Sequence, residues 1–152
     1  MKTLKVGDKV PNFTALDQDG NSISLSDYKG KQLIVFFYPK ASTPGCTAEA
    51  CNLRDNYELL QEKGYELVGV SADNQKRQAN FRTRYSFPFP LLADEDKNVI
   101  GIFGVWGQKK FMGREYDGIH RKTFIIDKKG IVAQVIDKVK TKTHASQILE
   151  NN

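Results

Sequence analysis

Apolar stretches separated by short polar turns predict strands that alternate with helices along this chain of 152 residues. Leu33–Tyr38 and Tyr65–Ser71 are apolar runs with the length and residue types of strands buried on both faces. Helical patterns follow each run, over residues 43–64 and 74–85. This alternation predicts an α/β protein with a central sheet covered by helices on both faces.

Shorter patterns extend the predicted sheet. A turn at residues 17–21, which contains Asp19-Gly20, separates two short segments and predicts an N-terminal β-hairpin within residues 10–28. A second turn, at residues 127–130, separates two apolar segments in the same way. The expected mixed sheet is completed by a strand at Leu91–Ala93, a short helix over residues 98–103 and a last helix that begins at Thr143.

The segment from Gly104 to Lys122 shows no regular period and is interpreted as a long loop. Its aromatic residues are Trp106, Phe111 and Tyr116. We expect them to pack against the interior; the alternatives are the rim of a pocket or a contact between subunits.

Composition and charge narrow the class of protein. A chain of this length with 39% hydrophobic residues is expected to form one domain, spanning residues 1–152, and not a disordered chain. The net charge is +5, but the lysines are scattered among 18 acidic residues, which favours a solvated surface over a nucleic-acid site. The N-terminal residues lack the apolar core of a signal peptide, and no apolar run is long enough to span a membrane. We therefore expect a cytoplasmic protein, in which cysteines are reduced at rest.

Cys46 lies at the start of the first predicted helix. Thr43 suits the N-cap, and Pro44 suits the first helical position. This register puts Cys46 in the first turn, where unpaired backbone N–H groups and the helix dipole stabilise negative charge. We expect its thiol to ionise more readily than that of a free cysteine, which gives the reactive thiolate.

Cys51 follows five residues later on the same predicted helix. Residues five apart on an α-helix have Cα atoms roughly 8.7 Å apart, whereas a disulfide needs Cα atoms no more than about 7 Å apart. A bond between the two cysteines therefore requires the first turns of the helix to unwind. Two unrelated cysteines are the alternative, because the spacing is not that of a CxxC redox pair.

The residues around Cys46 resemble a known signature. Pro39, Thr43 and Cys46 form Pro-x-x-x-Thr-x-x-Cys, which is similar to the peroxidatic-cysteine motif of peroxiredoxins. The longer segment FYPKASTPGCTAEACNLRD resembles the active-site signature of the peroxiredoxin Q group, also called bacterioferritin comigratory protein. The resemblance extends over nearly the whole chain, through KVGDKVPNFTALDQDGNSISLSDYKGK, YELVGVSAD and GIHRKTFIIDKKG. It implies a thioredoxin-like fold.

The resemblance also implies roles for particular residues. Cys46 would attack a peroxide and become a sulfenic acid. Arg121, in GIHR, would be the cation that stabilises the thiolate and the leaving oxygen. Thr43 would offer its hydroxyl to the peroxide, and Pro39 would shape the pocket and exclude water.

Cys51 fits the resolving role, in which it attacks the sulfenic acid and forms an intramolecular disulfide. The resemblance points to thioredoxin, or alternatively glutaredoxin, as the protein that reduces this disulfide. It implies hydrogen peroxide and organic hydroperoxides as substrates, with no metal, haem or flavin as cofactor. We expect a monomer, with a weak homodimer as the alternative.

Three further polar residues have weaker signals. Glu49 lies three residues after Cys46 on the same helical face and can orient an arginine. His120 and His144 are expected to have structural roles, since two distant histidines do not make a metal site.

Two other functions stay open at this point. One is a thioredoxin-like disulfide reductase, which the spacing of Cys46 and Cys51 disfavours. The other is a non-catalytic redox-sensing or nucleic-acid-binding module, which would retain DNA in a salt-dependent way without turning over peroxide.

Overall fold

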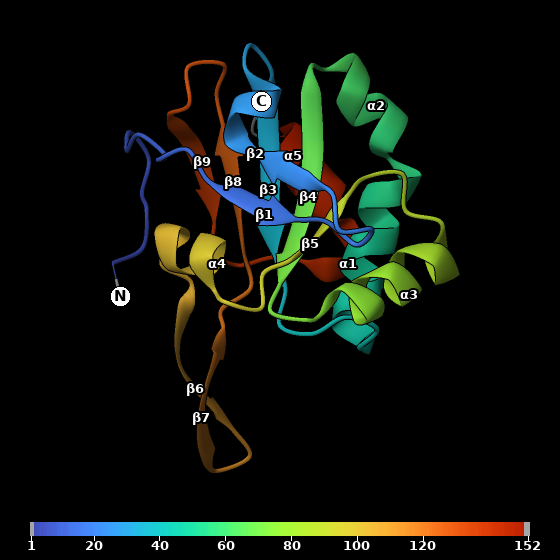
Figure 1. Cartoon of the computed structure of the whole chain (residues 1–152), viewed down its shortest axis with the longest axis vertical. Helices are drawn as coiled ribbons and strands as arrows, with labels where there is room; N and C mark the ends of the chain where they lie inside the picture. The colour runs from blue at the N-terminus through green and yellow to red at the C-terminus, as the bar shows by residue number, and fades with distance from the viewer. Residues whose placement is uncertain (1, 151–152) are drawn as a thin grey trace.

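A five-stranded mixed sheet forms the centre of the computed structural model, which describes residues 2–150 (Figure 1). Its strand order is β5-β4-β3-β8-β9, with β3, β4 and β5 parallel and with β8 and β9 antiparallel to their neighbours. The strands are β3 (Gln32–Phe37), β4 (Tyr65–Ser71), β5 (Leu91–Ala93), β8 (Lys122–Ile126) and β9 (Val132–Ile136). The helices are α1 (Pro44–Asp55), α2 (Tyr57–Glu62), α3 (Gln75–Tyr85), α4 (Asn98–Phe103) and α5 (His144–Glu150).

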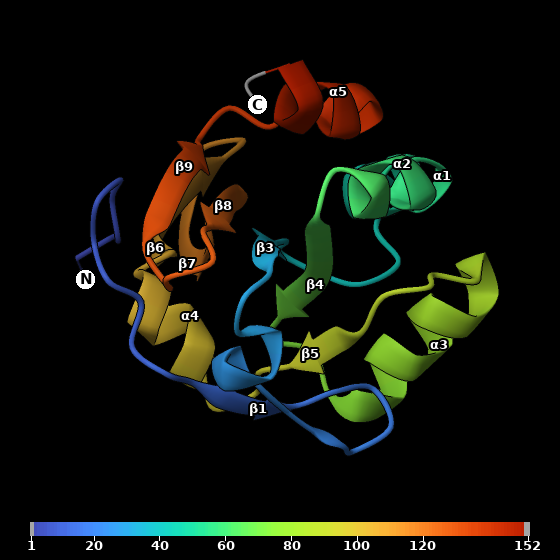
Figure 2. The same ribbon diagram turned by 90° about the horizontal axis from the view of Figure 1, so that it is seen from above.

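Helices cover both faces of this sheet, as the apolar runs predict. Figure 2 shows α1, α2 and α5 on one side of β3 and β4, with α4 on the other side. Alternate residues of β3 serve the two faces: Ile34 and Phe36 join a cluster with α1, α3 and α5, whereas Leu33, Val35 and Phe37 join a cluster with α4. Both faces of β3 are therefore buried, which fixes the strand as the centre of the fold.

The N-terminal hairpin is present, with β1 (Thr14–Leu16) antiparallel to β2 (Ser22–Ser24). The Asp17 carboxylate accepts hydrogen bonds from the backbone N–H groups of Asp19 and Asn21, which closes the turn between the strands. A 3₁₀ turn at Leu25–Tyr28 then leads into β3.

The prediction of a loop between residues 104 and 122 is wrong. This segment forms a second hairpin, β6 (Trp106–Phe111) and β7 (Arg114–Ile119), which extends away from the central sheet in Figure 1. Met112 and Gly113 make its two-residue turn, both with positive φ, at 51° and 80°. The pattern was missed because these strands are largely exposed beyond Trp106 and Ile119 and lack alternation, and because Met-Gly is not a common hairpin turn.

The packing expected for the aromatic residues of this segment holds only in part. Trp106 packs against the cluster on the α4 face, with the Lys97 ammonium 4.7 Å from its ring centroid. Phe111 and Tyr116 are 64% and 47% exposed, so the expectation of packing is wrong for both.

Two helix boundaries also differ from those expected. The helix that carries both cysteines ends at Asp55, and α2 begins after Asn56. The Asn56 side chain donates to the carbonyl of Asn52, which satisfies an acceptor left unpaired at the end of α1. The last helix begins at His144, after a 3₁₀ turn over Thr141–Thr143. Within residues 2–150, no helix combines the length and the apolar character needed to cross a lipid bilayer.

Candidate active site

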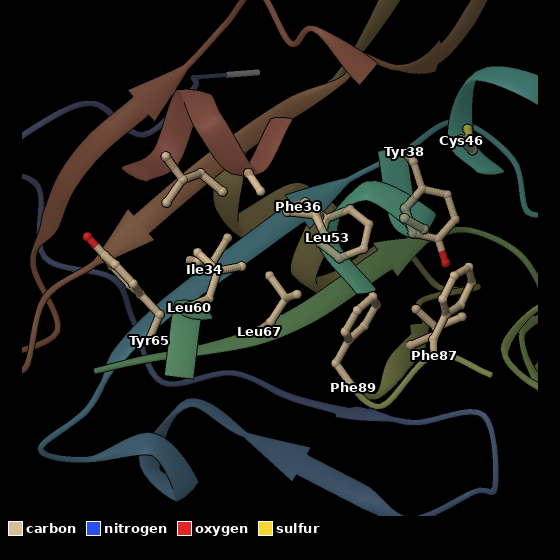
Figure 3. Packing of buried hydrophobic residues seen from close by; sticks show 14 of the residues in the cluster. Ile34, Phe36, Tyr38, Cys46, Leu53, Leu60, Tyr65, Leu67, Phe87 and Phe89 are labelled. Atoms are coloured by element: carbon tan, nitrogen blue, oxygen red, sulfur yellow. The ribbon is translucent and has the colours of Figure 1, made fainter. Parts of the chain in front are cut away.

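Cys46 lies in the first turn of α1, as expected, with Thr43 as the N-cap residue and Pro44 at the first helical position. Cys46 is 1% exposed and belongs to the hydrophobic cluster between the sheet and α1. Figure 3 shows Cys46 at one end of this cluster, near Tyr38. The loop after β3 therefore leads to a buried helix start, and Cys46 lies in the turn whose backbone N–H groups lack intrahelical partners.

A buried polar network fixes the loop between β3 and α1. The backbone N–H of Ala41 donates to Asp73, and the Ser71 hydroxyl donates to the same carboxylate oxygen. Gln78 of α3 donates to Ser71 and accepts from the Tyr38 hydroxyl. These bonds tie the loop before Cys46 to β4 and α3, so the helix start has a defined position.

Arg121 reaches the sulfur from the start of β8, the antiparallel neighbour of β3 in the sheet. Because β8 runs antiparallel to β3, Lys122 pairs with Phe37, and Arg121 lies just beyond the end of β3. Its Nη2 atom donates to Cys46 Sγ at 3.2 Å. A Cβ at Gly45 would lie 3.3 Å from the same nitrogen, so the glycine leaves room for the guanidinium.

Glu49 fixes the opposite end of the guanidinium, as its position on the helical face predicts. Arg121 Nη1 donates to Glu49 Oε1 at 2.5 Å, and the Glu49 side chain is fully buried. Burial raises the pKa of Glu49 to about 7, against the opposing effect of Arg121. For Arg121, burial alone lowers the pKa, but Glu49 and Cys46 together raise it above its ordinary value. The guanidinium therefore stays charged and bridges the sulfur and the carboxyl group.

Cys51 lies on α1 and is partly buried, and both cysteines are free thiols. Burial raises the pKa of the Cys51 thiol, Arg54 lowers it and Asp55 raises it, with a net upward shift. The wound helix thus holds Cys51 in its less reactive, protonated form.

Thr43 is placed as expected, but its hydroxyl does not cap the helix. Instead, Oγ1 donates to the carbonyl of Lys40 at 2.7 Å, and no side-chain bond to the helix N–H groups forms. The lone pairs of this hydroxyl remain available as acceptors near the helix start. Pro39 is partly buried and follows directly after Tyr38, at the beginning of the loop.

His144 is part of the site, which the sequence did not indicate beyond a structural role. It is fully buried, and its Nε2 lies 3.6 Å from Glu49 Oε2 and 2.7 Å from Thr123 Oγ1. His120 lies instead against Gly107 of β6, where a Cβ would come within 3.2 Å of its Nε2.

Lys109 of β6 is a second residue that the sequence did not indicate. Its Nζ donates to the carbonyl of Ile119, and burial, together with the charge of Arg121, lowers its pKa. Neither His144 nor Lys109 has a local signal, because each reaches the site only through the packing of distant elements. No group of three or more His, Cys, Asp or Glu side chains within residues 2–150 is arranged to hold a metal ion.

The chain is similar to known proteins over nearly its whole length. The model of the AhpC/TSA family matches residues 6–135. Peroxiredoxin Bcp of Escherichia coli (strain K12) is 46% identical over 149 residues, which cover 98% of this chain and 96% of the relative. The putative peroxiredoxin bcp of Haemophilus influenzae is 48% identical over 150 residues, which cover 99% and 97%.

A solved structure shows the same architecture. It comes from a study of the alkyl peroxide reduction activity of the Xanthomonas campestris bacterioferritin comigratory protein, in trapped intermediate/ligand complexes. Its TM-score is 0.85 at 33% identity, and the match covers 91% of this chain and 88% of that one. The thioredoxin-like α/β fold expected from the sequence is confirmed by these similarities and by the mixed sheet with its N-terminal hairpin.

Proposed function

The chain belongs to the AhpC/TSA family and is a thiol peroxidase of the Bcp/PrxQ group of peroxiredoxins, and on this premise we propose that Cys46 attacks the peroxide and that Cys51 resolves the product. The observation that carries the proposal is the 3.2 Å hydrogen bond from Arg121 to the Cys46 sulfur. A charged donor at this distance stabilises the anionic sulfur, which is the nucleophile. The site residues of the proposal are Cys46, Cys51, Thr43, Arg121 and Pro39.

The first step transfers one oxygen atom to Cys46. The thiolate attacks one peroxide oxygen, so that an S–O bond forms while the O–O bond breaks. The second oxygen leaves with the electron pair, takes up a proton and departs as water or an alcohol. Arg121 lies beside the sulfur and is the more exposed of the two, with 22% of its side chain accessible. Its guanidinium is therefore placed to stabilise charge on the leaving oxygen as well as on the sulfur.

Thr43 and Pro39 would position the peroxide. The Thr43 hydroxyl already donates to Lys40, so it can accept the hydrogen bond of a peroxide O–H and orient the molecule for attack. Pro39 has no N–H group and presents an apolar ring at the loop, which limits competition from water.

The second step requires α1 to unwind. Both cysteines lie within α1, where a spacing of five puts their Cα atoms roughly 8.7 Å apart, beyond the limit of about 7 Å for a disulfide. Unwinding also exposes Cys51, which removes the burial that raises its pKa. Its thiolate then attacks the sulfenic sulfur, an S–S bond forms and the oxygen leaves as water.

An external dithiol protein completes the cycle by thiol–disulfide exchange. Thioredoxin is proposed as this reductant, with glutaredoxin as the alternative. Hydrogen peroxide and organic hydroperoxides are the proposed substrates, in line with the alkyl peroxide reduction studied in the Xanthomonas campestris relative. The proposed working unit is one domain over residues 1–152, of which residues 1, 151 and 152 lie outside the described part, and it acts as a monomer.

The proposal is tested by NADPH oxidation in the presence of thioredoxin, thioredoxin reductase and hydrogen peroxide. The wild-type protein should sustain turnover, Cys46→Ser should abolish it, and Cys51→Ser should stop after one turnover. Turnover by Cys46→Ser would show that the nucleophile is assigned wrongly. Reduction of insulin without peroxide consumption would instead identify a disulfide reductase.

Far-UV circular dichroism tests the unwinding of α1. One equivalent of peroxide should reduce the helical signal of the wild-type protein and leave that of Cys51→Ser unchanged. A confirmed bond between Cys46 and Cys51, with no change in the spectrum, would refute the unwinding step.

A further inference from the structure

A buried group of polar side chains contacts Arg121 through Nη1, the guanidinium nitrogen that does not bond to the sulfur. Glu49 of α1 and His144 of α5 are both fully buried. One carboxyl oxygen of Glu49, Oε1, accepts from Arg121. The other, Oε2, has no hydrogen-bond donor, although it is buried and only 3.6 Å from His144 Nε2. A buried carboxylate oxygen without a hydrogen-bond donor destabilises the folded protein, so the protonation of Glu49 and His144 needs an explanation.

The hydrogen bonds of Gln147 determine which nitrogen of His144 carries a proton. Gln147 Oε1 accepts from the backbone N–H of Lys140, and its Nε2 donates to the carbonyl of Lys138. These two backbone partners fix the orientation of the amide, because one is only a donor and the other only an acceptor. His144 Nδ1 lies 2.8 Å from the same Oε1. Since Oε1 can only accept, Nδ1 must carry a hydrogen.

A neutral His144 then has its lone pair on Nε2, facing Glu49. The Thr123 hydroxyl, 2.7 Å away, can donate to this lone pair. The nitrogen lone pair and the unpaired Glu49 Oε2 would nevertheless face each other without a proton between them. One added proton, on Oε2 or on Nε2, removes this repulsion and gives Oε2 a partner after a shift of a few tenths of an ångström.

We propose that Glu49 and His144 share one proton in the reduced enzyme, and that this proton keeps the charge of Arg121 available to the Cys46 sulfur. The inference rests on the proposed role of Cys46 and concerns the regulation of the same site. With the proton present, the Glu49–His144 pair is neutral, and the thiolate is the one anion that contacts the guanidinium among residues 2–150. Without it, a full carboxylate competes with the sulfur for Arg121. His144 is thus a positioning residue, which acts through Glu49 and Arg121.

The surroundings of the pair support this assignment. Burial raises the pKa of Glu49 to about 7, with Arg121 opposing. Burial also lowers the pKa of His144, with Gln147 raising it and Arg121 lowering it. Arg121 is the charged group that acts on both members of the pair, and Cys46 of α1 and Lys109 of β6 in turn lie near Arg121. Both shifts favour a protonated Glu49 beside a neutral histidine below neutral pH, so the shared proton is lost as the pH rises.

The kinetic test compares wild-type protein with Glu49→Gln. A glutamine amide resembles the protonated acid, since its oxygen can accept from Arg121 while its NH₂ donates to His144. The rate of Cys46 oxidation by hydrogen peroxide is measured by stopped flow in single turnovers from pH 5.5 to pH 9. The ratio of the Glu49→Gln rate to the wild-type rate should rise about tenfold across neutral pH, which corresponds to one pKa unit of coupling. Glu58→Gln, on the exposed side of α2, serves as the matched control and should give a flat ratio.

Two results separate the inference from the proposed function. If wild-type Cys46 does not react with peroxide at any pH, the proposed function fails. If it reacts, but the ratio for Glu49→Gln is independent of pH or falls as the pH rises, the shared proton is refuted.

A ¹⁵N NMR titration of the histidine rings in wild-type protein gives a second test that does not change Glu49 or His144. The chain has two histidines, so His120→Asn, which changes the histidine outside the pair, is used only to assign the signals. His144 should carry a hydrogen on Nδ1 throughout, and its Nε2 signal should shift with the same midpoint as the kinetic ratio. An Nε2–H tautomer with a bare Nδ1, or an Nε2 signal that does not titrate between pH 5.5 and pH 9, would overturn the proposal.

Discussion

Replacement of Arg121 by methionine removes the charge beside Cys46 while keeping an unbranched apolar stem. The guanidinium nitrogen is 3.2 Å from the sulfur, at a site where Cys46 is 1% exposed. At an effective dielectric constant of about 20, two unit charges at this distance attract each other by about 5 kcal/mol. The activation free energy should rise by only part of this amount. In Arg121→Met the thiolate is still stabilised by the helix N–H groups, and during the reaction negative charge moves from the sulfur to the leaving oxygen. Loss of one such donor is expected to slow the reaction by roughly 100- to 1,000-fold.

The assay follows the single tryptophan, Trp106, by stopped-flow fluorescence after mixing with hydrogen peroxide. The matched control is Arg84→Met, at an exposed position of α3, which should react at the wild-type rate. Arg121→Met also leaves Glu49 buried without its cation, so the double variant with Glu49→Gln separates this structural cost from the loss of charge. A rate for the double variant within about tenfold of wild type would refute the electrostatic role of Arg121.

The remaining predictions concern the helix and the buried carboxyl group. Cys51→Ser should gain two oxygen atoms at Cys46 under excess peroxide, measured by intact mass, because the sulfenic acid is no longer trapped as a disulfide; a mass gain equal to that of wild type would contradict the resolving role. Asn52→Ala removes the acceptor of the Ala145 backbone N–H, which ties α1 to α5. The loss of about 1 kcal/mol should speed disulfide formation about fivefold in quenched-flow alkylation, whereas slower formation would show that this bond does not restrain unwinding. Glu49 has a pKa raised from 4.5 to about 7, so its contribution to stability is complete below pH 4.5 and is lost as the pH rises through 7. The free energy of unfolding of wild type relative to Glu49→Gln should fall by up to about 3 kcal/mol between pH 5 and pH 8 in urea titrations; a constant difference would mean that Glu49 is ionised throughout.

The local features of the site were predictable because they depend on neighbours in the chain. Thr43 and Pro44 set the register of α1, and this register alone puts Cys46 in the first turn. The spacing of five to Cys51 on the same helix likewise determines that a disulfide and an intact α1 exclude each other. The exposed hairpin of β6 and β7 was not predictable in this way, since neither a buried face nor a common turn sequence marks it.

The charge environment of the sulfur was decided by the tertiary structure. Arg121 reaches Cys46 because β8 pairs antiparallel with β3, which brings Lys122 beside Phe37 at the end of the strand that leads to the site. His144 reaches Glu49 because α5 packs on α1, although the two residues are far apart in the sequence. A sequence lists which groups can carry charge, but their ionisation depends on burial and on partners a few ångströms away. The sequence thus determined that the proposed nucleophile lies in the first turn of α1, and only the folded chain decided which cation and carboxyl group lie beside it.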